Sequence, residues 1–402
     1  MLEKLLTKFG LSPEQQKIIV KVFKISLILC ITVTAAAWAL QTVLIKMQSA
    51  KKDSAKTSVS GKLNEYFEKK SHDLLPIDIE AHQFTAQYYL KTEQPDKAIE
   101  HILRILPLQK TNRALKLDLA TAYLQSAQYP EALESFKKLD ESDTSDQYSP
   151  SVAARIGLTL FYLGRINESI EKLNACIAEY PRCAEALCYM GEVKAATVNP
   201  SSLADDYFRK SVEIDPKYAE AWYQRARMCM TLGQYAISRQ YLLKVLEIEP
   251  LNVKTHARLG MAYYYLDEQE MAKKAYQTAL ALNPEDYNTH YNLGELYYTK
   301  YEDNVSALVE FKKTLEGNPS HPEANFRTGV ICLSNNMVKE AVAYLEKARE
   351  SSPKNTRILL QLGVAYERMS MKNEALGIYR LILDFDALNP VAKQKVELLS
   401  SS

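Results

Sequence analysis

Residues 219–250 read AEAWYQRARMCMTLGQYAISRQYLLKVLEIEP, and this stretch decides the fold class. Its first part predicts a helix with one face made, at spacings of three and four, by Trp222, Arg225, Ala226 and Cys229. Its second part predicts a helix whose matching face is made by Ser238, Leu242 and Val245. Gly233-Gln234-Tyr235 lies between the two and makes a turn. The stretch therefore predicts an antiparallel helical hairpin.

The hairpin recurs with a regular period. Prolines close successive units at Pro181, Pro216, Pro250, Pro284, Pro319, Pro353 and Pro390. The gaps between them are 35, 34, 34, 35, 34 and 37 residues. Proline suits these junctions because it lacks the backbone donor that a helix interior requires. A period near 34 residues with helical patterning inside each unit predicts a solenoid of helix pairs.

Two sites in every unit hold a small residue. The site in the first helix is occupied by Ala86, Ala120, Gly157, Gly191, Ala226, Gly260, Gly294, Gly329 and Gly363. The site in the second helix is occupied by Ala98, Ala132, Ser169, Ala204, Ser238, Ala272, Ala307, Ala341 and Ala375. Two helices approach to about 8–10 Å only where no large side chain holds them apart. The pattern therefore predicts close packing within each pair.

These units resemble the tetratricopeptide repeat family. The unit that follows the quoted stretch fits the family consensus at Leu259-Gly260, Tyr263, Ala272, Tyr276, Ala279 and Pro284. The resemblance implies an all-α, right-handed superhelical solenoid of about nine helix-turn-helix units over residues 79–389, followed by a C-terminal capping helix and tail over 390–402. The first unit departs from the pattern, with Pro95 in its turn and an early close at Pro107.

An apolar segment near the start predicts a transmembrane helix. Residues 25–45 carry no charge, and as a helix of about 31 Å they match a hydrocarbon core of about 30 Å. Lysines flank both ends, which a buried core helix would not need. A cleaved signal peptide is the alternative, because residues 35–39 offer small residues for cleavage. The polar leader is 24 residues long and the apolar run continues to Ile45, which favours an uncleaved anchor. Residues 1–24 are then a basic tail, and residues 46–78 a linker with a short helix.

The side of the membrane on which the repeats lie stays open. Five lysines precede the apolar segment and five follow it within residues 46–62, so the positive-inside rule gives a tie. A lysine-rich tail before a first apolar helix tends to stay in the cytoplasm, which favours a periplasmic or other extracytoplasmic array. Five cysteines beyond the segment instead suit a reducing, cytoplasmic compartment.

The sequence contains no catalytic motif that we recognise. It lacks a glycine-rich phosphate loop, a Gly-x-Ser-x-Gly elbow and a His-Glu-x-x-His motif. Cys176, Cys183 and Cys188 are spaced by six and four residues, unlike the ligands of a zinc ribbon. His256 and His290 occupy the consensus tryptophan place, which predicts packing roles, and the acids are expected on solvated helix backs. We therefore expect no enzyme activity, cofactor, metal or small-molecule substrate. Residues 63–402 carry a net charge of −6, against +7 for residues 1–62, so nucleic acid is not an expected partner.

The predicted function is that of a membrane-anchored scaffold or adaptor. The resemblance places unpacked first-helix residues on a concave groove, namely Tyr223, Arg227, Lys254, Arg258, Tyr264, Tyr265, Asn288, Tyr291, Glu295, Tyr298 and Phe326. Tyrosine is enriched at protein-binding surfaces, so a partner's helix or extended peptide is the expected ligand, in assembly of a membrane or envelope complex. Some of these rings could instead pack only against neighbouring turns.

Two other functions fit the same features. One is a regulatory adaptor subunit that controls an envelope-biogenesis enzyme. The chain is similar to bacterial proteins that combine an N-terminal anchor, a tetratricopeptide array and a C-terminal metal ribbon and that control lipopolysaccharide synthesis, but it lacks the terminal Cys-x-x-Cys pairs. The other is a cytoplasmic recruiter that brings soluble proteins to the membrane.

Overall fold

The computed structural model of the chain describes residues 76–141, 149–197 and 202–401. All regular secondary structure in these residues is helical, and they include no strand. The predicted transmembrane helix over 25–45, the basic tail and the linker up to residue 75 lie outside the described residues. Within the described part, no helix combines the length and apolar character needed to cross a membrane.

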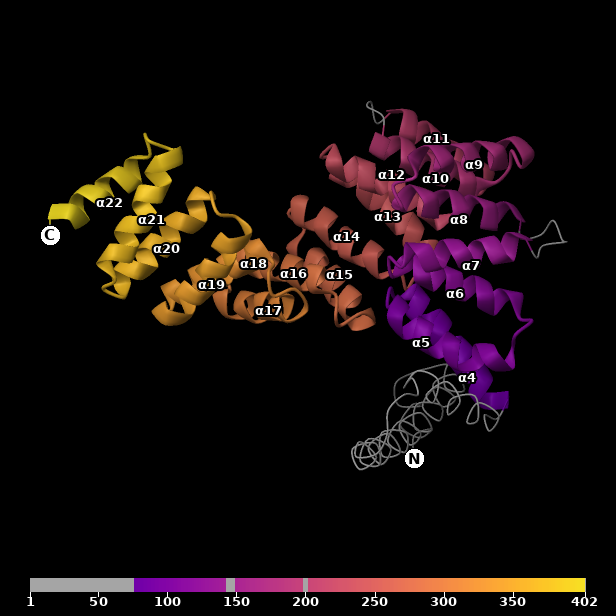
Figure 1. Cartoon of the computed structure of the whole chain (residues 1–402), viewed down its shortest axis with the longest axis horizontal. Helices are drawn as coiled ribbons and strands as arrows, with labels where there is room; N and C mark the ends of the chain where they lie inside the picture. The colour runs from indigo at the N-terminus through magenta and orange to yellow at the C-terminus, as the bar shows by residue number, and fades with distance from the viewer. Residues whose placement is uncertain (1–75, 142–148, 198–201, 402) are drawn as a thin grey trace, which may run out of the picture. The chain divides into compact units, whose positions relative to one another are not determined.

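The described helices follow one another as nine consecutive pairs and a final single helix, in the manner of a tetratricopeptide-like solenoid (Figure 1). The first described helix, α4, begins at Pro76, before the predicted start of the repeats at residue 79. The pairs are α4 Pro76–Lys91 with α5 Pro95–Ile105, α6 Arg113–Gln125 with α7 Tyr129–Glu141, α8 Ser149–Tyr162 with α9 Ile166–Glu179, α10 Ala184–Thr197 with α11 Ser202–Ile214, α12 Ala219–Thr231 with α13 Tyr235–Ile248, α14 Val253–Tyr265 with α15 Gln269–Leu282, α16 Tyr287–Lys300 with α17 Asn304–Gly317, α18 Pro322–Ser334 with α19 Val338–Ser351, and α20 Thr356–Arg368 with α21 Lys372–Phe385. A short 3-10 helix, η2, spans Leu106–Leu108, and α22 spans Pro390–Ser401.

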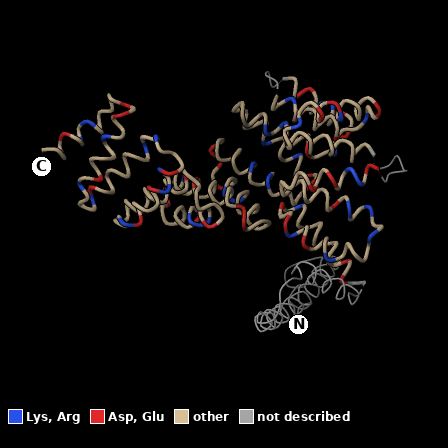
Figure 2. The backbone as a smooth tube through the Cα atoms, in the orientation of Figure 1, with Lys and Arg blue, Asp and Glu red and all other residues tan. Residues whose placement is uncertain are grey.

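The chain divides into two compact units. The first includes residues up to 86 and residues 100–115, and its described part buries Ile102, Ile105 and Leu115. The second includes residues 87–99 and 116–402, and its apolar core runs from pair to pair as a series of buried clusters. Basic and acidic residues alternate along the described helices of the second unit (Figure 2).

Within the second unit, the small residues of a pair let its two helices touch. A Cβ added to Gly260 would lie 2.6 Å from the ring of Tyr276, which is 2% exposed on the opposite helix. The second-helix sites that the structure describes are buried, including Ala272 and Ala307. Where serine replaces alanine, as at Ser238, its hydroxyl donates to the carbonyl oxygen of the first-helix site, Ala226, at 2.9 Å. The two small sites are therefore in direct contact, which confirms the close packing predicted from the sequence.

The turn between the two helices of a pair contains one residue in the left-handed backbone region. Glycine takes this place at Gly164 and Gly233, with φ of 76° and 71°. Other turns place a residue with a side chain there, among them Glu93 at φ 55° and Glu302 at φ 52°. The turns that the structure describes are therefore alike in backbone although only two of them use glycine, so the sequence marks the others weakly.

The consensus tryptophan place has a hydrogen-bonding role at the unit junctions. Trp222 Nε1 donates to the carbonyl oxygen of Pro216 at 3.0 Å, six residues earlier. Three other side chains make the equivalent contact, His256 with Pro250 at 2.9 Å, His290 with Pro284 at 3.0 Å and Asn325 with Pro319 at 3.0 Å. A side chain with an N–H group can thus replace tryptophan here, which explains the two histidines by packing and hydrogen bonding.

Candidate protein-binding face

The first helices of successive pairs touch one another in the second unit. Contacts join α10 with α12, α14 with α16 and α18 with α20. We call the surface shared by these helices the first-helix face. It carries the eleven residues that the sequence analysis selects as a groove, so their surroundings decide what the face can bind.

Four of the aromatic rings on this face lie under a cation from the following pair. Lys254 Nζ lies 4.9 Å from the ring centre of Tyr223, and Arg258 Nε donates to the hydroxyl of the same residue at 3.1 Å. The pattern repeats along the array, with Lys300 over Tyr264 at 5.2 Å, Arg327 over Tyr298 at 4.7 Å and Arg357 over Phe326 at 4.8 Å. Cations within about 6 Å of a ring centre are attracted to its face. These four rings are therefore held in place by the next repeat.

Carboxylates on the face also pair with cations of the following helix. Arg327 binds both carboxylate oxygens of Glu295, at 2.7 and 3.0 Å, with both side chains less than one-fifth exposed. Lys254 lies 3.4 Å from Glu220, and Arg357 lies 3.5 Å from Glu323. Glu295 and Lys254, two of the predicted groove residues, are thus engaged in contacts between repeats.

The predicted groove residues differ in how much a partner could touch. Tyr223 and Phe326 are buried, with 6% and 5% of their surface exposed. Tyr265 is 52% exposed and stacks on Tyr235 with ring centres 4.5 Å apart, and Asn288 is exposed. The others are half-buried, namely Arg227, Lys254, Arg258, Tyr264, Tyr291, Glu295 and Tyr298. The open part of the face therefore lies on α14 and α16.

The half-buried rings of α14 and α16 are positioned by specific contacts. The hydroxyl of Tyr264 lies 2.9 Å from the hydroxyl of Thr299 on the next first helix. Tyr291 packs against the rings of Phe311 and His321, with ring centres 5.9 and 4.7 Å away, and burial raises the pKa of its hydroxyl. The phenol of Tyr291 is therefore neutral, and both phenols are oriented, with an apolar ring and a polar tip on one surface.

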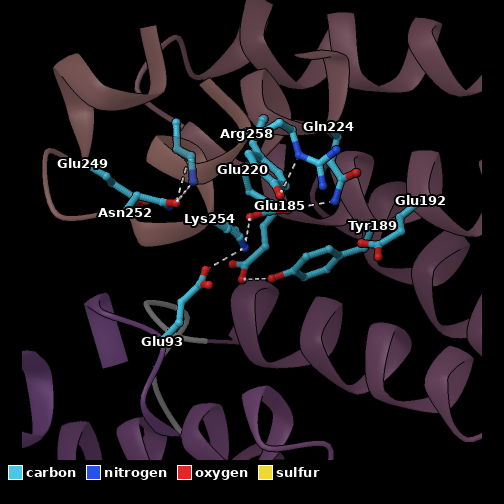
Figure 3. A network of polar contacts seen from close by, with 12 residues as sticks. Glu93, Glu185, Tyr189, Glu192, Glu220, Gln224, Glu249, Asn252, Lys254 and Arg258 are labelled. Carbon is cyan, nitrogen blue, oxygen red and sulfur yellow. Dashed lines mark hydrogen bonds and ion pairs between the residues drawn. The ribbon is translucent and has the colours of Figure 1, made fainter. Parts of the chain in front are cut away.

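A polar cluster centred on Lys254 lies at the α10–α14 end of the face (Figure 3). Lys254 approaches two carboxylates, Glu220 at 3.4 Å and Glu93 at 3.7 Å. Gln224 Nε2 donates to Glu220 at 2.8 Å. The carboxylate of Glu220 raises the pKa of Lys254 well above its ordinary range; Glu93 adds to this, and burial opposes it. Lys254 is therefore charged at any physiological pH.

The acids of this cluster are the residues that sequence reasoning missed. We expected the acids on solvated helix backs, and that expectation is wrong for Glu185, Glu192 and Glu220 on the first-helix face. Burial raises the pKa of Glu192, whose carboxylate accepts a hydrogen bond from Tyr162 at 2.5 Å. The spacing held a usable signal, because Glu220 precedes Lys254 by 34 residues, one repeat period.

The described residues provide no group of three or more histidines, cysteines or acids arranged to hold a metal ion. Cys176, Cys183, Cys188, Cys229 and Cys332 are free thiols. Burial raises the pKa of the Cys188 thiol well above its ordinary value, so this thiol is protonated and unreactive.

Three family models match the chain over consecutive segments. One described as a TPR repeat matches residues 260–300, and two described as tetratricopeptide repeats match residues 207–240 and 302–356. These three segments carry tetratricopeptide repeats. The segment 260–300 includes Tyr264, Tyr265 and Asn288, and so contains the open part of the first-helix face.

One solved structure shows the same fold at low sequence identity, and two others are similar over part of this chain. The Cut9–Hcn1 hetero-tetramer of the APC/C matches with a TM-score of 0.58 and 18% identity, over 80% of this chain and 63% of that chain. The chain thus spans less than two thirds of that protein. Pseudomonas aeruginosa pilF matches with a TM-score of 0.48 and 17% identity, over 56% of this chain and 97% of that one. YrrB, described as a TPR protein with an unusual peptide-binding site, matches with a TM-score of 0.38 and 22% identity, over 46% of this chain and 95% of that one. Comparison with curated proteins gives no match.

Proposed function

We propose that this protein is a membrane-anchored scaffold that binds a segment of a partner protein on the first-helix face of its tetratricopeptide repeats. The observation that carries the proposal is the open surface of α14 and α16. There Tyr264, Tyr265 and Tyr291 present apolar rings with polar tips, and contacts with neighbouring repeats hold them in place. Preorganised rings lose little conformational freedom on binding, so more of the contact energy appears as affinity.

The mixed surface favours a protein segment as ligand. Asn288 is exposed beside the rings and can hydrogen-bond to a peptide backbone. The cations and acids of the face largely neutralise one another between repeats, as in the bidentate pair of Arg327 with Glu295. A surface of rings and amides with its charges already paired suits a helix or extended peptide better than a polyanion such as nucleic acid.

The anchor gives the scaffold its place of action in this proposal. Residues 25–45 form an uncharged stretch of membrane-spanning length with lysines on both sides. Tethering would confine the face to a thin layer beside the membrane, where a high effective concentration lets a modest affinity suffice. We propose a role in assembly of a membrane or envelope complex, with the array on the extracytoplasmic side.

The test is capture of partners by the full-length chain and by variants of the open face. We expect the double variant Tyr264→Ala/Tyr265→Ala, and separately Tyr291→Ala, to lose the partner that the unchanged chain recovers. Phe385→Ala is the matched control, because Phe385 is a 37% exposed ring on α21, a second helix. Equal recovery of the partner by the tyrosine variants and by the control would refute the proposal.

A further inference from the structure

The turn between α4 and α5 contacts helices that are far away in the sequence. Residues 87–99 belong to the same compact unit as residues 116–402. In that unit the carboxylate of Glu93 lies 3.7 Å from Lys254 Nζ, across 161 positions of sequence. Three polar contacts accompany this pair: Gln94 Nε2 to the carbonyl oxygen of Leu282 at 3.2 Å, Asn283 Nδ2 to the carbonyl oxygen of Glu93 at 3.5 Å, and Lys97 to Glu285 at 3.0 Å.

The contacts of the turn are polar and replaceable. Lys97 and Glu285 are 40% and 73% exposed, so water screens their attraction. Burial raises the pKa of Glu93, with Glu220 adding to the rise and Lys254 opposing it. The charged form of the Glu93 carboxylate is therefore disfavoured where the turn packs against the first-helix face, compared with the same carboxylate in water. By contrast, Lys254 keeps its second partner, Glu220, through contacts within the repeats.

Removal of the turn would change the charge balance around Lys254. Lys254 approaches two carboxylates, Glu220 at 3.4 Å and Glu93 at 3.7 Å. A further acid, Asp286, disfavours the charged form of Glu93. When Glu93 leaves, Lys254 keeps Glu220 but loses one of its two carboxylate partners, so its ammonium group can pair with one carboxylate supplied from elsewhere.

We propose that the α4–α5 turn is an internal ligand of the first-helix face, and that an acidic segment of a partner protein binds at Lys254 by displacing Glu93. This inference rests on the proposed function, and it names the chemistry of the partner segment. The turn lowers the apparent affinity of the face, since a partner binds only the fraction of molecules in which the turn is displaced.

The backbone conformation of the turn allows a variant that removes only the Glu93 carboxylate. Glu93 has a φ of 55°, so Glu93→Gly removes the carboxylate while glycine accommodates the backbone without strain. Glu302→Gly is the matched control, because Glu302 occupies the corresponding turn place at φ 52°, is exposed, and lies in the α16–α17 turn. Both variants ease the backbone, and only the first removes a carboxylate from Lys254.

Two measurements on the full-length chain test the proposal. The first is the rate at which N-hydroxysuccinimide acetate modifies Lys254, followed by mass spectrometry. The second is the fluorescence anisotropy of a labelled hexaglutamate peptide. We expect Glu93→Gly to raise the modification rate about fivefold and to tighten peptide binding about fivefold, the effect of about 1 kcal/mol at 25 °C. We expect Glu302→Gly to change neither, and Glu93→Gly/Lys254→Gln to lose the gain in peptide affinity.

Each result has one meaning. An unchanged modification rate of Lys254 in Glu93→Gly would overturn the role of the turn as an internal ligand. A faster rate without tighter peptide binding would overturn the acidic partner. Peptide binding that survives Lys254→Gln would overturn the site. None of these readouts depends on the natural partner, so a failed capture experiment with the tyrosine variants would refute the proposed function without affecting them.

Discussion

Replacement of Gly260 by alanine tests why the first-helix site must be small. The added Cβ would lie 2.6 Å from two ring carbons of Tyr276, whereas ordinary contacts begin near 3.4 Å. Helix propensity alone would favour alanine by about 1 kcal/mol. Overpacking of a filled core costs about 1–3 kcal/mol, and Tyr276 is 2% exposed and packed within a core cluster. We therefore expect a net loss of about 1 kcal/mol, the middle of the overpacking range less the gain in propensity.

The preceding unit shows which second change should compensate. There Ala226 stands in place of Gly260, and Leu242, sixteen residues later, stands in place of Tyr276. Both side chains are fully buried in one core cluster. Tyr276→Leu alone should cost about 2 kcal/mol through the cavity it leaves. In the double variant the new methyl group fills part of this cavity, so we expect a favourable coupling of about 1–2 kcal/mol.

Hydrogen exchange of the amides in α14 and α15 is the suitable assay, because a repeat array need not unfold in one step. Gly377→Ala is the control, since an added Cβ there meets no atom within 4 Å, so alanine should be neutral or should stabilise α21. The reasoning is refuted if the two alanine variants behave alike, or if the changes at Gly260 and Tyr276 are simply additive.

Three other predictions follow from the contacts and the sequence. Burial opposes the charge of Glu310, but hydrogen bonds from His290 and Lys313 outweigh it and hold its pKa below 4.5. Because the pKa of Glu310 is lower in the folded state, its charged carboxylate stabilises the fold above pH 4.5, and this stabilisation is lost as the pH falls further. Exchange protection of α16 and α17 should therefore drop in acid, and Glu310→Gln should flatten this pH dependence. Arg327→Lys keeps the charge but loses the bidentate contact with Glu295, so thermal unfolding should show a loss of about 1 kcal/mol; an unchanged transition would mean that charge alone suffices. Deletion of residues 1–45 should release the chain from the membrane fraction, and protease should digest the array in intact spheroplasts, whereas protection until lysis would place it in the cytoplasm.

The helix pairs could be predicted because their pattern is local and repeated. A proline about every 34 residues, a face of apolar residues and a small residue at each of two sites act within one hairpin. The structure confirms that these sites touch, as Ser238 does by its hydrogen bond to Ala226. Such features survive in the sequence because each pair must bury the same faces against its neighbours.

The state of each groove residue depends on neighbours one repeat away. The sequence placed Tyr223 and Tyr265 alike on a groove, yet Tyr223 is buried beneath Lys254 and Tyr265 is half exposed. Long side chains such as lysine choose among many rotamers, and only the packed structure shows which ring or acid they reach. Part of this was readable, since Glu220 and Lys254 lie one period apart.

The contact of Glu93 with Lys254 is decided by tertiary structure alone. Its separation of 161 residues is not a multiple of the repeat period, so no periodic argument predicts it. Repetition in the sequence determines how each pair of helices packs and which faces adjacent pairs share. The position at which a turn contacts a distant helix depends on small rotations that accumulate over many pairs of helices. Their total is known only from the folded structure.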